Sequence, residues 1–288
     1  MQTVPSGHAH RLSSLTPHLV QAEDLLRRPS ENRLFIECRL GTDLADERQA
    51  YREQHIHGAV YAQIREVFAR QPGPGEGNLP LPDFNCLQEQ LRQWHVDAET
   101  QVIVYGPSPA LAARAWWVLR WAGLKHVQVL DGGIRSWVNH GGAVAQGDSF
   151  AASRVPYRTL LLQPGGLPQI EVESVEHLPA DVLLIDARDE SSFIAGSIPG
   201  SCNLPASELW TPSTSLRTVQ EVRTHFERIG ALQAREVVAY CGGGVLSALA
   251  VLALSAFGVT PRLFVGSWSQ WNKSAARMAR SATARVSA

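Results

Sequence analysis

The same succession of segments occurs twice along this chain of 288 residues, and this internal repeat limits its possible folds more than any other feature. Each copy opens with a short apolar run that ends in polar residues, at 34–39 and again at 182–188. An aromatic residue, an isoleucine and a glycine then recur in register within 51–60 and 193–201. A repeat of this length indicates two copies of one folding unit.

In the second part of each copy, a strand-like apolar run leads through a loop into an apolar helical stretch, and another strand-like run follows. These segments are 102–106, 110–124 and 127–130 in the first copy, and 237–241, 245–257 and 262–265 in the second. Strands that alternate with helices are typical of a parallel sheet flanked by helices. The sequence therefore predicts an α/β fold of two such domains, at 12–148 and 166–280. We expect a linker within 145–166 and a surface loop at 71–82, because both stretches are rich in residues that break helices and strands.

Charge and cysteine content exclude several classes of protein. The 26 basic and 27 acidic residues give a formal net charge of −1, which favours neither a nucleic-acid partner nor a membrane surface. No apolar run is long enough to span a bilayer, and residues 1–18 do not resemble a secretory signal. The four cysteines form no CxxC pair, so we expect no structural zinc, no disulfide framework and a cytoplasmic location.

One segment carries a pattern that indicates chemistry. Cys241 ends the predicted strand 237–241 and is followed by a loop that enters the next helix. That loop consists of Gly242, Gly243, Gly244, Val245, Leu246 and Ser247. Ligand sites of parallel sheets lie at this edge, glycines let backbone N–H groups converge, and a helix N-terminus adds a positive field. Such a setting favours a nucleophilic thiolate, and it would also hold the terminal sulfur of a persulfide.

A buried cysteine before a glycine turn can instead be a simple packing residue. The first copy argues against that alternative, because Gly106 stands where the second copy has Cys241. Pro107 and Pro109 then remove backbone donors that an anion would need. One copy is therefore suited to hold an anion, and the other is not.

From about residue 12 to 275, the chain resembles the tandem-domain rhodaneses, which include thiosulfate and 3-mercaptopyruvate sulfurtransferases. The motifs that carry the resemblance are HIHGA at 55–59, DGG at 131–133 with Trp137, SIPGS at 197–201, CGGGV at 241–245 and GSW at 266–268. The resemblance implies an inactive N-terminal domain that packs against a C-terminal domain carrying the active loop. It also implies a reaction without a cofactor, in which Cys241 takes a sulfane sulfur from a small-molecule donor. The persulfide then passes this sulfur to cyanide, a thiol or thioredoxin.

The sequence says less about which sulfur donor is used than about the family. Thiosulfate enzymes often place Arg and Lys directly after the cysteine, whereas this loop is uncharged and is closer to that of mercaptopyruvate enzymes. Two positions differ from the loop of mercaptopyruvate enzymes, since Gly243 and Leu246 stand where Ser and Thr are common in them. Both departures remove a hydroxyl group, so some hydrogen bonding to the sulfur is expected to come from backbone N–H groups alone.

Two further residues are candidates for substrate binding. Arg188 stands at the substrate-binding arginine of the family, where its guanidinium would clamp a carboxylate or sulfonate at two points; the alternative is a surface or interdomain arginine. His55 matches a histidine that faces the active loop in relatives; the alternative is a turn histidine bonded to the backbone. His55 and His57 lack a third ligand nearby, so we assign no metal.

Two other functions remain open at this point. A cysteine-based phosphatase or arsenate reductase would need an arginine six residues after the cysteine, where this chain has Ser247. A non-catalytic rhodanese module that binds a partner would require Cys241 to be an ordinary, slowly reacting thiol.

Overall fold

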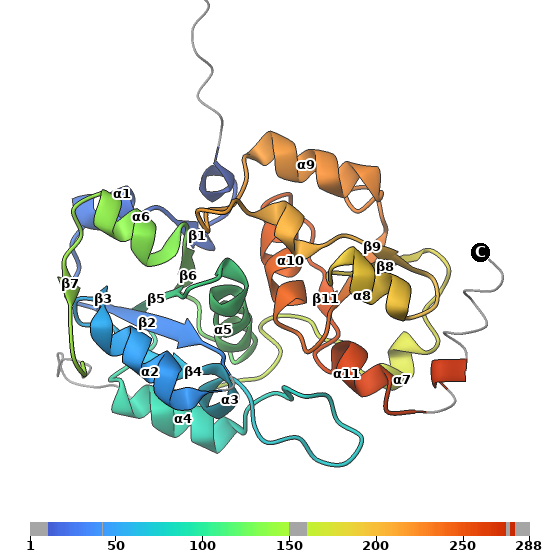
Figure 1. Cartoon of the computed structure of the whole chain (residues 1–288), viewed down its shortest axis with the longest axis horizontal. Helices are drawn as coiled ribbons and strands as arrows, with labels where there is room; N and C mark the ends of the chain where they lie inside the picture. The colour runs from blue at the N-terminus through green and yellow to red at the C-terminus, as the bar shows by residue number, and fades with distance from the viewer. Residues whose placement is uncertain (1–10, 42, 150–159, 275–276, 280–288) are drawn as a thin grey trace, which may run out of the picture.

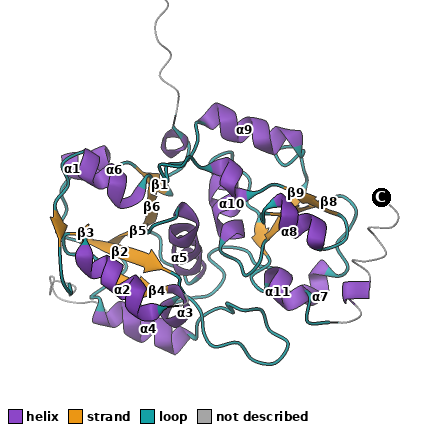
Figure 2. Cartoon of the chain, viewed as in Figure 1, coloured by secondary structure: helices purple, strands orange, loops and turns teal. Residues whose placement is uncertain are grey.

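The computed structural model describes residues 11–41, 43–149, 160–274 and 277–279, which form two α/β domains (Figure 1). The middle of the expected linker (150–159) and the expected end of the second domain at residue 280 lie outside the described residues. Figure 2 shows strands flanked by helices in both domains. The predicted α/β class is therefore confirmed.

The N-terminal domain contains a parallel five-stranded sheet in the order β1-β6-β5-β2-β4. A second, two-stranded antiparallel sheet joins β3 to β7. The strands are β1 (Leu19–Val20), β2 (Arg33–Arg39), β3 (His55–Ile56), β4 (Val60–Gln63), β5 (Gln101–Tyr105), β6 (Val127–Leu130) and β7 (Val144–Ala145). The helices are η1 (Leu12–Ser14), α1 (Ala22–Arg27), α2 (Leu44–Glu53), α3 (Ile64–Val67), α4 (Phe84–Gln93), α5 (Pro109–Trp121) and α6 (Gly133–Asn139).

The C-terminal domain repeats this plan with a parallel four-stranded sheet in the order β11-β10-β8-β9. Its strands are β8 (Val182–Asp186), β9 (Ser201–Asn203), β10 (Glu236–Tyr240) and β11 (Arg262–Leu263). Its helices are α7 (Val172–Val175), α8 (Glu190–Ala195), η2 (Ala206–Leu209), α9 (Val219–Arg228), α10 (Leu246–Ser255) and α11 (Ser267–Trp271). The strand predicted at 262–265 is shorter than expected, because its ladder to β10 ends at Leu263.

Both sheets are buried on two faces, which explains why their central strands are continuous apolar runs. In β5, Val102 and Val104 join the large core, whereas Ile103 and Tyr105 join a separate cluster on the other face. The two sheets also share their register, since Glu37 pairs with Tyr105 in the first domain and Asp186 pairs with Tyr240 in the second. The repeat seen in the sequence is therefore a repeat of structure.

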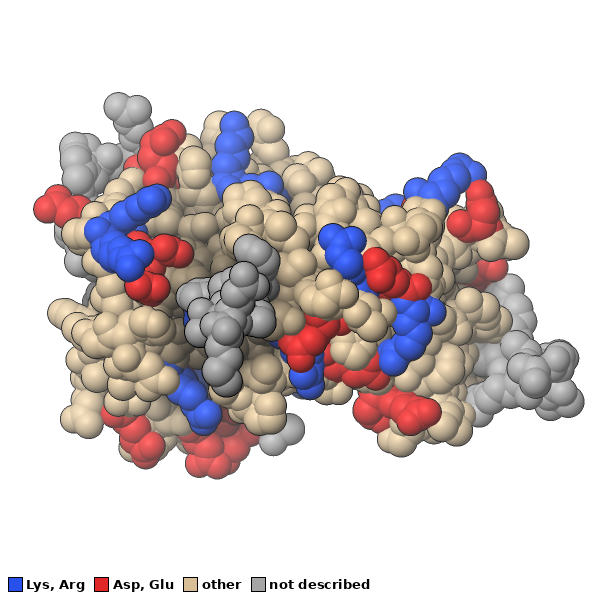
Figure 3. Space-filling model, turned by 90° about the horizontal axis from the view of Figure 1, so that it is seen from above, with Lys and Arg blue, Asp and Glu red and all other residues tan. Residues whose placement is uncertain are grey.

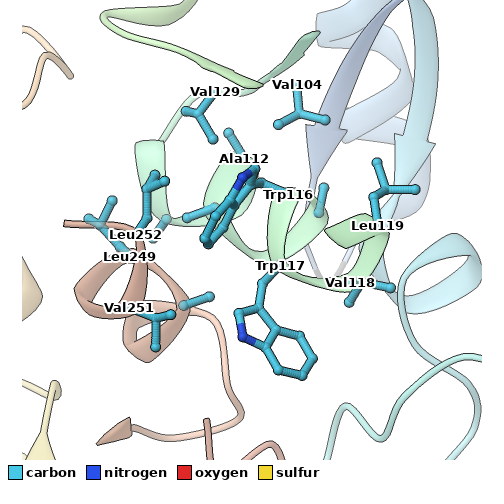
Figure 4. Packing of buried hydrophobic residues seen from close by; sticks show 14 of the residues in the cluster. Val104, Ala112, Trp116, Trp117, Val118, Leu119, Val129, Leu249, Val251 and Leu252 are labelled. Carbon is cyan, nitrogen blue, oxygen red and sulfur yellow. The ribbon is translucent and has the colours of Figure 1, made fainter. Parts of the chain in front are cut away.

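The domains are joined through α5 and α10, which pack against each other and belong to one hydrophobic core (Figure 1). Figure 4 shows Trp116 and Trp117 of α5 beside Leu249 and Leu252 of α10. Both indoles are completely buried and belong to the core that the two domains share. Because burial of apolar surface stabilises by about 25 cal/mol per Å², this shared core holds the two domains together.

Among the residues that the structure describes, no helix is long and apolar enough to cross a bilayer. No group of three or more potential metal ligands occurs in the same part of the chain. On the face shown in Figure 3, basic and acidic side chains are interspersed and neither kind forms a large patch.

Candidate active site at the Cys241 loop

Cys241 lies directly after β10, a strand paired on both sides, at the carboxyl edge of the C-terminal sheet. Its backbone is fixed by two residues of the segment that follows β11. The N–H of Cys241 donates to Ser267 Oγ at 3.2 Å, and its carbonyl accepts from the N–H of Trp268 at 2.9 Å. The side chain is 1% exposed. The strand and the turn therefore hold this cysteine at the edge where parallel sheets place their ligand sites.

Two donors point at the sulfur of Cys241. The N–H of Gly244 lies 3.1 Å from Sγ, and the hydroxyl of Ser247 lies 3.4 Å from it. The helix α10 begins at Leu246 without a side-chain cap, so no side chain of its own takes up the donors at its N-terminus. Donors aimed at a buried sulfur favour its anionic form.

Ser247, one of the predicted loop residues, thus adds a hydroxyl donor to the backbone N–H of Gly244. Gly242 and Gly243 do not bond to the sulfur in this structure; Gly242 is exposed, and Gly243 is partly exposed. Val245 and Leu246 are partly buried against the core. Of the six predicted loop residues, Gly244 and Ser247 therefore contact the sulfur, and Gly242 lies on the side open to solvent.

Gly244 has a backbone that other residues resist. Its φ is +81°, in the left-handed region. A Cβ at this position would lie 2.9 Å from Nη1 of Arg114 and 2.9 Å from the carbonyl oxygen of Val265. Only glycine fits the position from which the backbone N–H reaches the sulfur.

The matching loop of the N-terminal domain has no room for a cysteine. A Cβ at Gly106 would lie 2.4 Å from the carbonyl oxygen of Cys38. The following helix α5 begins with Pro109 and is capped by Ser108, whose side chain accepts from the N–H of Ala110 at 3.3 Å. This loop is an ordinary capped helix start, as the contrast between the two copies predicted.

The 71–82 loop of the N-terminal domain reaches across to the Cys241 loop (Figure 1). The N–H of Asn78 donates to Ser269 Oγ at 2.9 Å, and Gly77 packs against the backbone of Gly266. The side chain of Leu79 would be 3.7 Å from a Cβ at Gly243. The predicted surface loop therefore covers the candidate site. The absence of a side chain at Gly77 lets the backbone of the loop pack closely on the backbone of Gly266.

Comparison with known proteins agrees with this geometry. The model of the rhodanese-like domain matches residues 21–140 and again 172–274. The chain belongs to the rhodanese family. The two matched segments correspond to the two sheets described above.

Relatives of this rhodanese cover most of its length. The 3-mercaptopyruvate sulfurtransferase of Escherichia coli is 30% identical over 82% of this chain and 88% of the relative. The thiosulfate sulfurtransferase of Gallus gallus is 28% identical over 78% of this chain and 81% of the relative. The crystal structure of SseA from Escherichia coli, a 3-mercaptopyruvate sulfotransferase, superposes with a TM-score of 0.74 at 28% identity and covers 88% of this chain and 100% of SseA. The rhodanese described here is a sulfurtransferase.

Arg188 of this rhodanese is buried in an ion pair rather than exposed. Its Nε and Nη2 contact both carboxylate oxygens of Asp186 at 2.5–3.1 Å, and Nη2 also donates to the carbonyl of Gly196 at 2.5 Å. Burial alone would lower the pKa of Arg188. The hydrogen bonds to Asp186 and the negative charge of that carboxylate outweigh burial, so the pKa of Arg188 is raised. The guanidinium lies 4.8 Å from the ring centroid of Trp268, whose N–H bonds to the carbonyl of Cys241. Arg188 is thus adjacent to the Cys241 loop, with two of its three nitrogens occupied.

The N-terminal domain holds the same pair. Arg39 Nε donates to Glu37 Oε1 at 2.6 Å, and both residues occupy the positions on β2 that Asp186 and Arg188 occupy at the end of β8. Because the N-terminal domain has no reactive cysteine at Gly106, its ion pair serves the fold. The repetition favours a structural role for the pair in the second domain as well.

His55 is completely buried within the N-terminal domain. Its Nδ1 lies 3.0 Å from the carbonyl oxygen of Tyr51, and its ring stacks on that of Tyr51 at 4.1 Å. No hydrogen bond or ring contact of His55 within the described part of the chain reaches the Cys241 loop. This geometry favours the alternative of a histidine bonded to the backbone.

The other cysteines differ from Cys241 in their surroundings. Burial raises the pKa of Cys38 well above its ordinary value and that of Cys202 to about 11, so both are neutral thiols at physiological pH. Cys86 is exposed on α4. The thiols of Cys38 and Cys202 donate to the carbonyl oxygens of Ile36 and Leu184, whereas the sulfur of Cys241 accepts from Gly244 and Ser247.

Sequence reasoning missed one residue beside the site, Arg114 of α5. Its side chain is 0% exposed, and a Cβ at Gly244 would lie 2.9 Å from its Nη1. The sequence did contain a signal, since Arg114 stands with Arg120 in a mainly apolar helical stretch, and arginine is almost never fully buried without a partner. The sequence did not say toward which domain this side chain points.

Proposed function

We propose that this rhodanese moves a sulfane sulfur from 3-mercaptopyruvate or thiosulfate to a thiophilic acceptor through a persulfide on Cys241. The proposal rests on one observation, the two donors that the Cys241 loop directs at Sγ. Such donors would stabilise both the attacking thiolate and the terminal sulfur of the persulfide. The acceptor is cyanide in an assay and a thiol or thioredoxin in a cell.

The proposed reaction consists of two successive displacement steps. In the first, the Cys241 thiolate attacks the sulfane sulfur of the donor and a new S–S bond forms. The C–S bond of mercaptopyruvate breaks and its carbon takes a proton to give pyruvate, or the S–S bond of thiosulfate breaks and sulfite leaves. In the second, the acceptor attacks the terminal sulfur, the persulfide S–S bond breaks, and the Cys241 thiolate is restored. Such alternation gives ping-pong kinetics.

Access to the sulfur is through the side of the loop formed by Gly242 and Gly243. A Cβ at Gly242 would meet nothing within 4 Å, so this side has room for a donor. No Lys or Arg lies within 242–247, which favours a carboxylate donor of low charge, 3-mercaptopyruvate, over the thiosulfate dianion. Arg188 would contribute through its third nitrogen, Nη1, while the other two stay on Asp186 and Gly196.

Mass spectrometry tests the proposal directly. After treatment with 3-mercaptopyruvate or thiosulfate, the peptide that contains Cys241 should gain about 32 Da, the mass of one sulfur. Cyanide should remove the added mass. Peptides with Cys38, Cys86 and Cys202 serve as internal controls and should not change. Steady turnover with no adduct on Cys241, or with an adduct on another cysteine, would refute the proposal.

A change at Gly243 tests the assignment of the donor. A Cβ there would lie 3.7 Å from Leu79, an ordinary contact, so Gly243→Ser is expected to fold normally. The added hydroxyl restores a group that is common in mercaptopyruvate enzymes, and we expect kcat/KM for 3-mercaptopyruvate to rise by about tenfold, as one good hydrogen bond in the transition state would give. The rate with thiosulfate should change less. A selective rise with thiosulfate would show that the preference for a carboxylate donor is wrong.

A further inference from the structure

Arg114 is a buried cation that the reaction described above does not use. It lies on α5 of the N-terminal domain, among alanine, tryptophan and leucine side chains that pack against α10. Burial lowers the pKa of Arg114 to about 10, and a negative charge on Cys241 acts in the opposite direction. A guanidinium in such surroundings requires a compensating partner.

The partners of Arg114 are incomplete. Its Nη2 donates to the carbonyl oxygens of Phe68 at 3.2 Å and Leu79 at 2.9 Å. Its Nε and Nη1 are buried and have no hydrogen-bond partner. Among the described residues, no carboxylate forms an ion pair with Arg114. Arg39, which is partly buried, and the buried Arg188 differ in this respect, because each is paired with the acidic residue two positions before it.

The unpartnered side of Arg114 lies at the Cys241 loop. Its Nη1 is 2.9 Å from the point where a Cβ at Gly244 would stand. The N–H of Gly244 in turn donates to the sulfur of Cys241 at 3.1 Å. Two acidic groups of the surroundings are already paired, since Asp186 bonds to Arg188 and Glu76 of the covering loop bonds to Arg70, while Lys273 donates to the carbonyl of Glu76.

Arg114 also fixes the segment that covers the site. Phe68 precedes the 71–82 loop and Leu79 lies near its end, so one guanidinium nitrogen holds both sides of this segment. Leu79 is the residue that faces Gly243. The same side chain therefore contacts the covering segment with one nitrogen and lies against Gly244 with another.

We propose that Arg114 of the N-terminal domain is the counter-ion of the sulfur anion at Cys241 and positions the loop that binds it. The inference rests on the proposed function for the persulfide, but it applies equally to the free thiolate. It gives the N-terminal domain, which lacks a reactive cysteine, a part in the active site of its neighbour. The two domains would then form one composite site.

Alkylation of Cys241 by iodoacetamide between pH 5 and pH 10 tests this inference without any sulfur donor. Because a nearby positive charge favours the thiolate, Arg114→Met should react at least about tenfold more slowly at pH 7, which corresponds to a shift of about one pH unit in the profile. The two rates should converge at high pH. Arg114→Lys keeps the charge and should recover much of the rate at pH 7.

The chain offers a matched control in Arg120, on the same helix. Arg120 is partly exposed, and its Nη1 bonds to the carbonyls of Leu124 and Lys125, away from the Cys241 loop. Arg120→Met should leave the alkylation profile unchanged. An equal loss of rate at every pH in Arg114→Met, with no shift of the profile, would indicate a merely structural role and overturn the inference.

A second measurement covers the case in which Arg114→Met does not fold. The unaltered chain should become more stable relative to Cys241→Ala from pH 5 to pH 9, measured as the difference in unfolding free energy. The reason is that Arg114 attracts the Cys241 thiolate but not the neutral thiol. A difference independent of pH would contradict the inference. The experiments distinguish failure of the two proposals. If the alkylation profile shifts in Arg114→Met but no persulfide forms on Cys241, only the proposed sulfur transfer is wrong. If the persulfide forms normally but the profile does not shift, only the proposed role of Arg114 is wrong.

Discussion

The Gly244→Ala variant is expected to lose persulfide formation almost as completely as a Cys241→Ser variant. A methyl group at Gly244 would lie 2.9 Å from both Nη1 of Arg114 and the carbonyl oxygen of Val265. The loop must therefore shift, and the N–H that now lies 3.1 Å from the sulfur moves with it. Removal of one preorganised donor to a reacting anion typically costs about 100-fold to 1,000-fold in rate. We expect a loss in this range, measured as the rate of adduct formation on Cys241.

Two other glycines separate the possible causes of that loss. Gly258, in the turn after α10, has a φ of +77° and open space around its Cα, so Gly258→Ala adds backbone strain without a clash. It should lower the unfolding free energy by about 1 kcal/mol and leave persulfide formation intact. Gly230→Ala, in the turn after α9, likewise meets open space outside the Cys241 loop and should change the rate of persulfide formation by less than about threefold. If Gly244→Ala keeps its rate within that range, the N–H of Gly244 does not hold the sulfur.

The sequence was sufficient to predict the features that depend on local patterns. Apolar runs such as 237–241 are buried on both faces, so they are recognisable as parallel strands without knowledge of their neighbours. The position of Cys241 follows from the strand before it and the glycines after it. The contrast with the loop at Gly106 is recognisable for the same reason, since Pro107 and Pro109 remove donors that any anion site needs.

The features that the sequence left open depend on contacts between the domains. The breakers of the 71–82 loop predict a turn-rich segment, but not that it packs on Gly266 and Gly243. An arginine in a mainly apolar helix signals a special role, but α5 has two of them. The packing of α5 on α10 decides that Arg114 rather than Arg120 is the buried one, and in which direction its side chain points. Contacts of this kind join residues more than a hundred positions apart, and no local pattern records them.

Arg188 illustrates a different limit. An arginine two residues after an aspartate at the end of a strand suits two arrangements, a clamp for a substrate or an ion pair within the fold. The structure shows the ion pair with Asp186, and the first domain repeats it with Glu37 and Arg39. The repeat that identified the fold thus also provides the comparison that distinguishes the two roles.

Arg188→Met is expected to destabilise the chain by about 3–5 kcal/mol, because it leaves the fully buried Asp186 without its partner. Urea unfolding measures this loss. Asp186→Asn combined with Arg188→Met removes both charges and should regain most of the stability, since the remaining groups carry no uncompensated charge. Arg39→Met in the first domain is the matched control: it should also destabilise, because Glu37 is buried, but leave the kinetics unchanged.

The kinetics of the double variant then decide whether Arg188 also binds the donor. If the ion pair serves the fold alone, the Asp186→Asn, Arg188→Met chain should keep its KM for 3-mercaptopyruvate within about threefold. Loss of a charged contact to the donor carboxylate would instead raise KM by about tenfold or more, since hydrogen bonds to charged groups contribute about 1.5–3 kcal/mol. A tenfold rise in KM with unchanged stability of Arg188→Met would contradict the structural role and restore the arginine as a clamp. A stable double variant with normal KM would leave recognition of the donor to the loop residues.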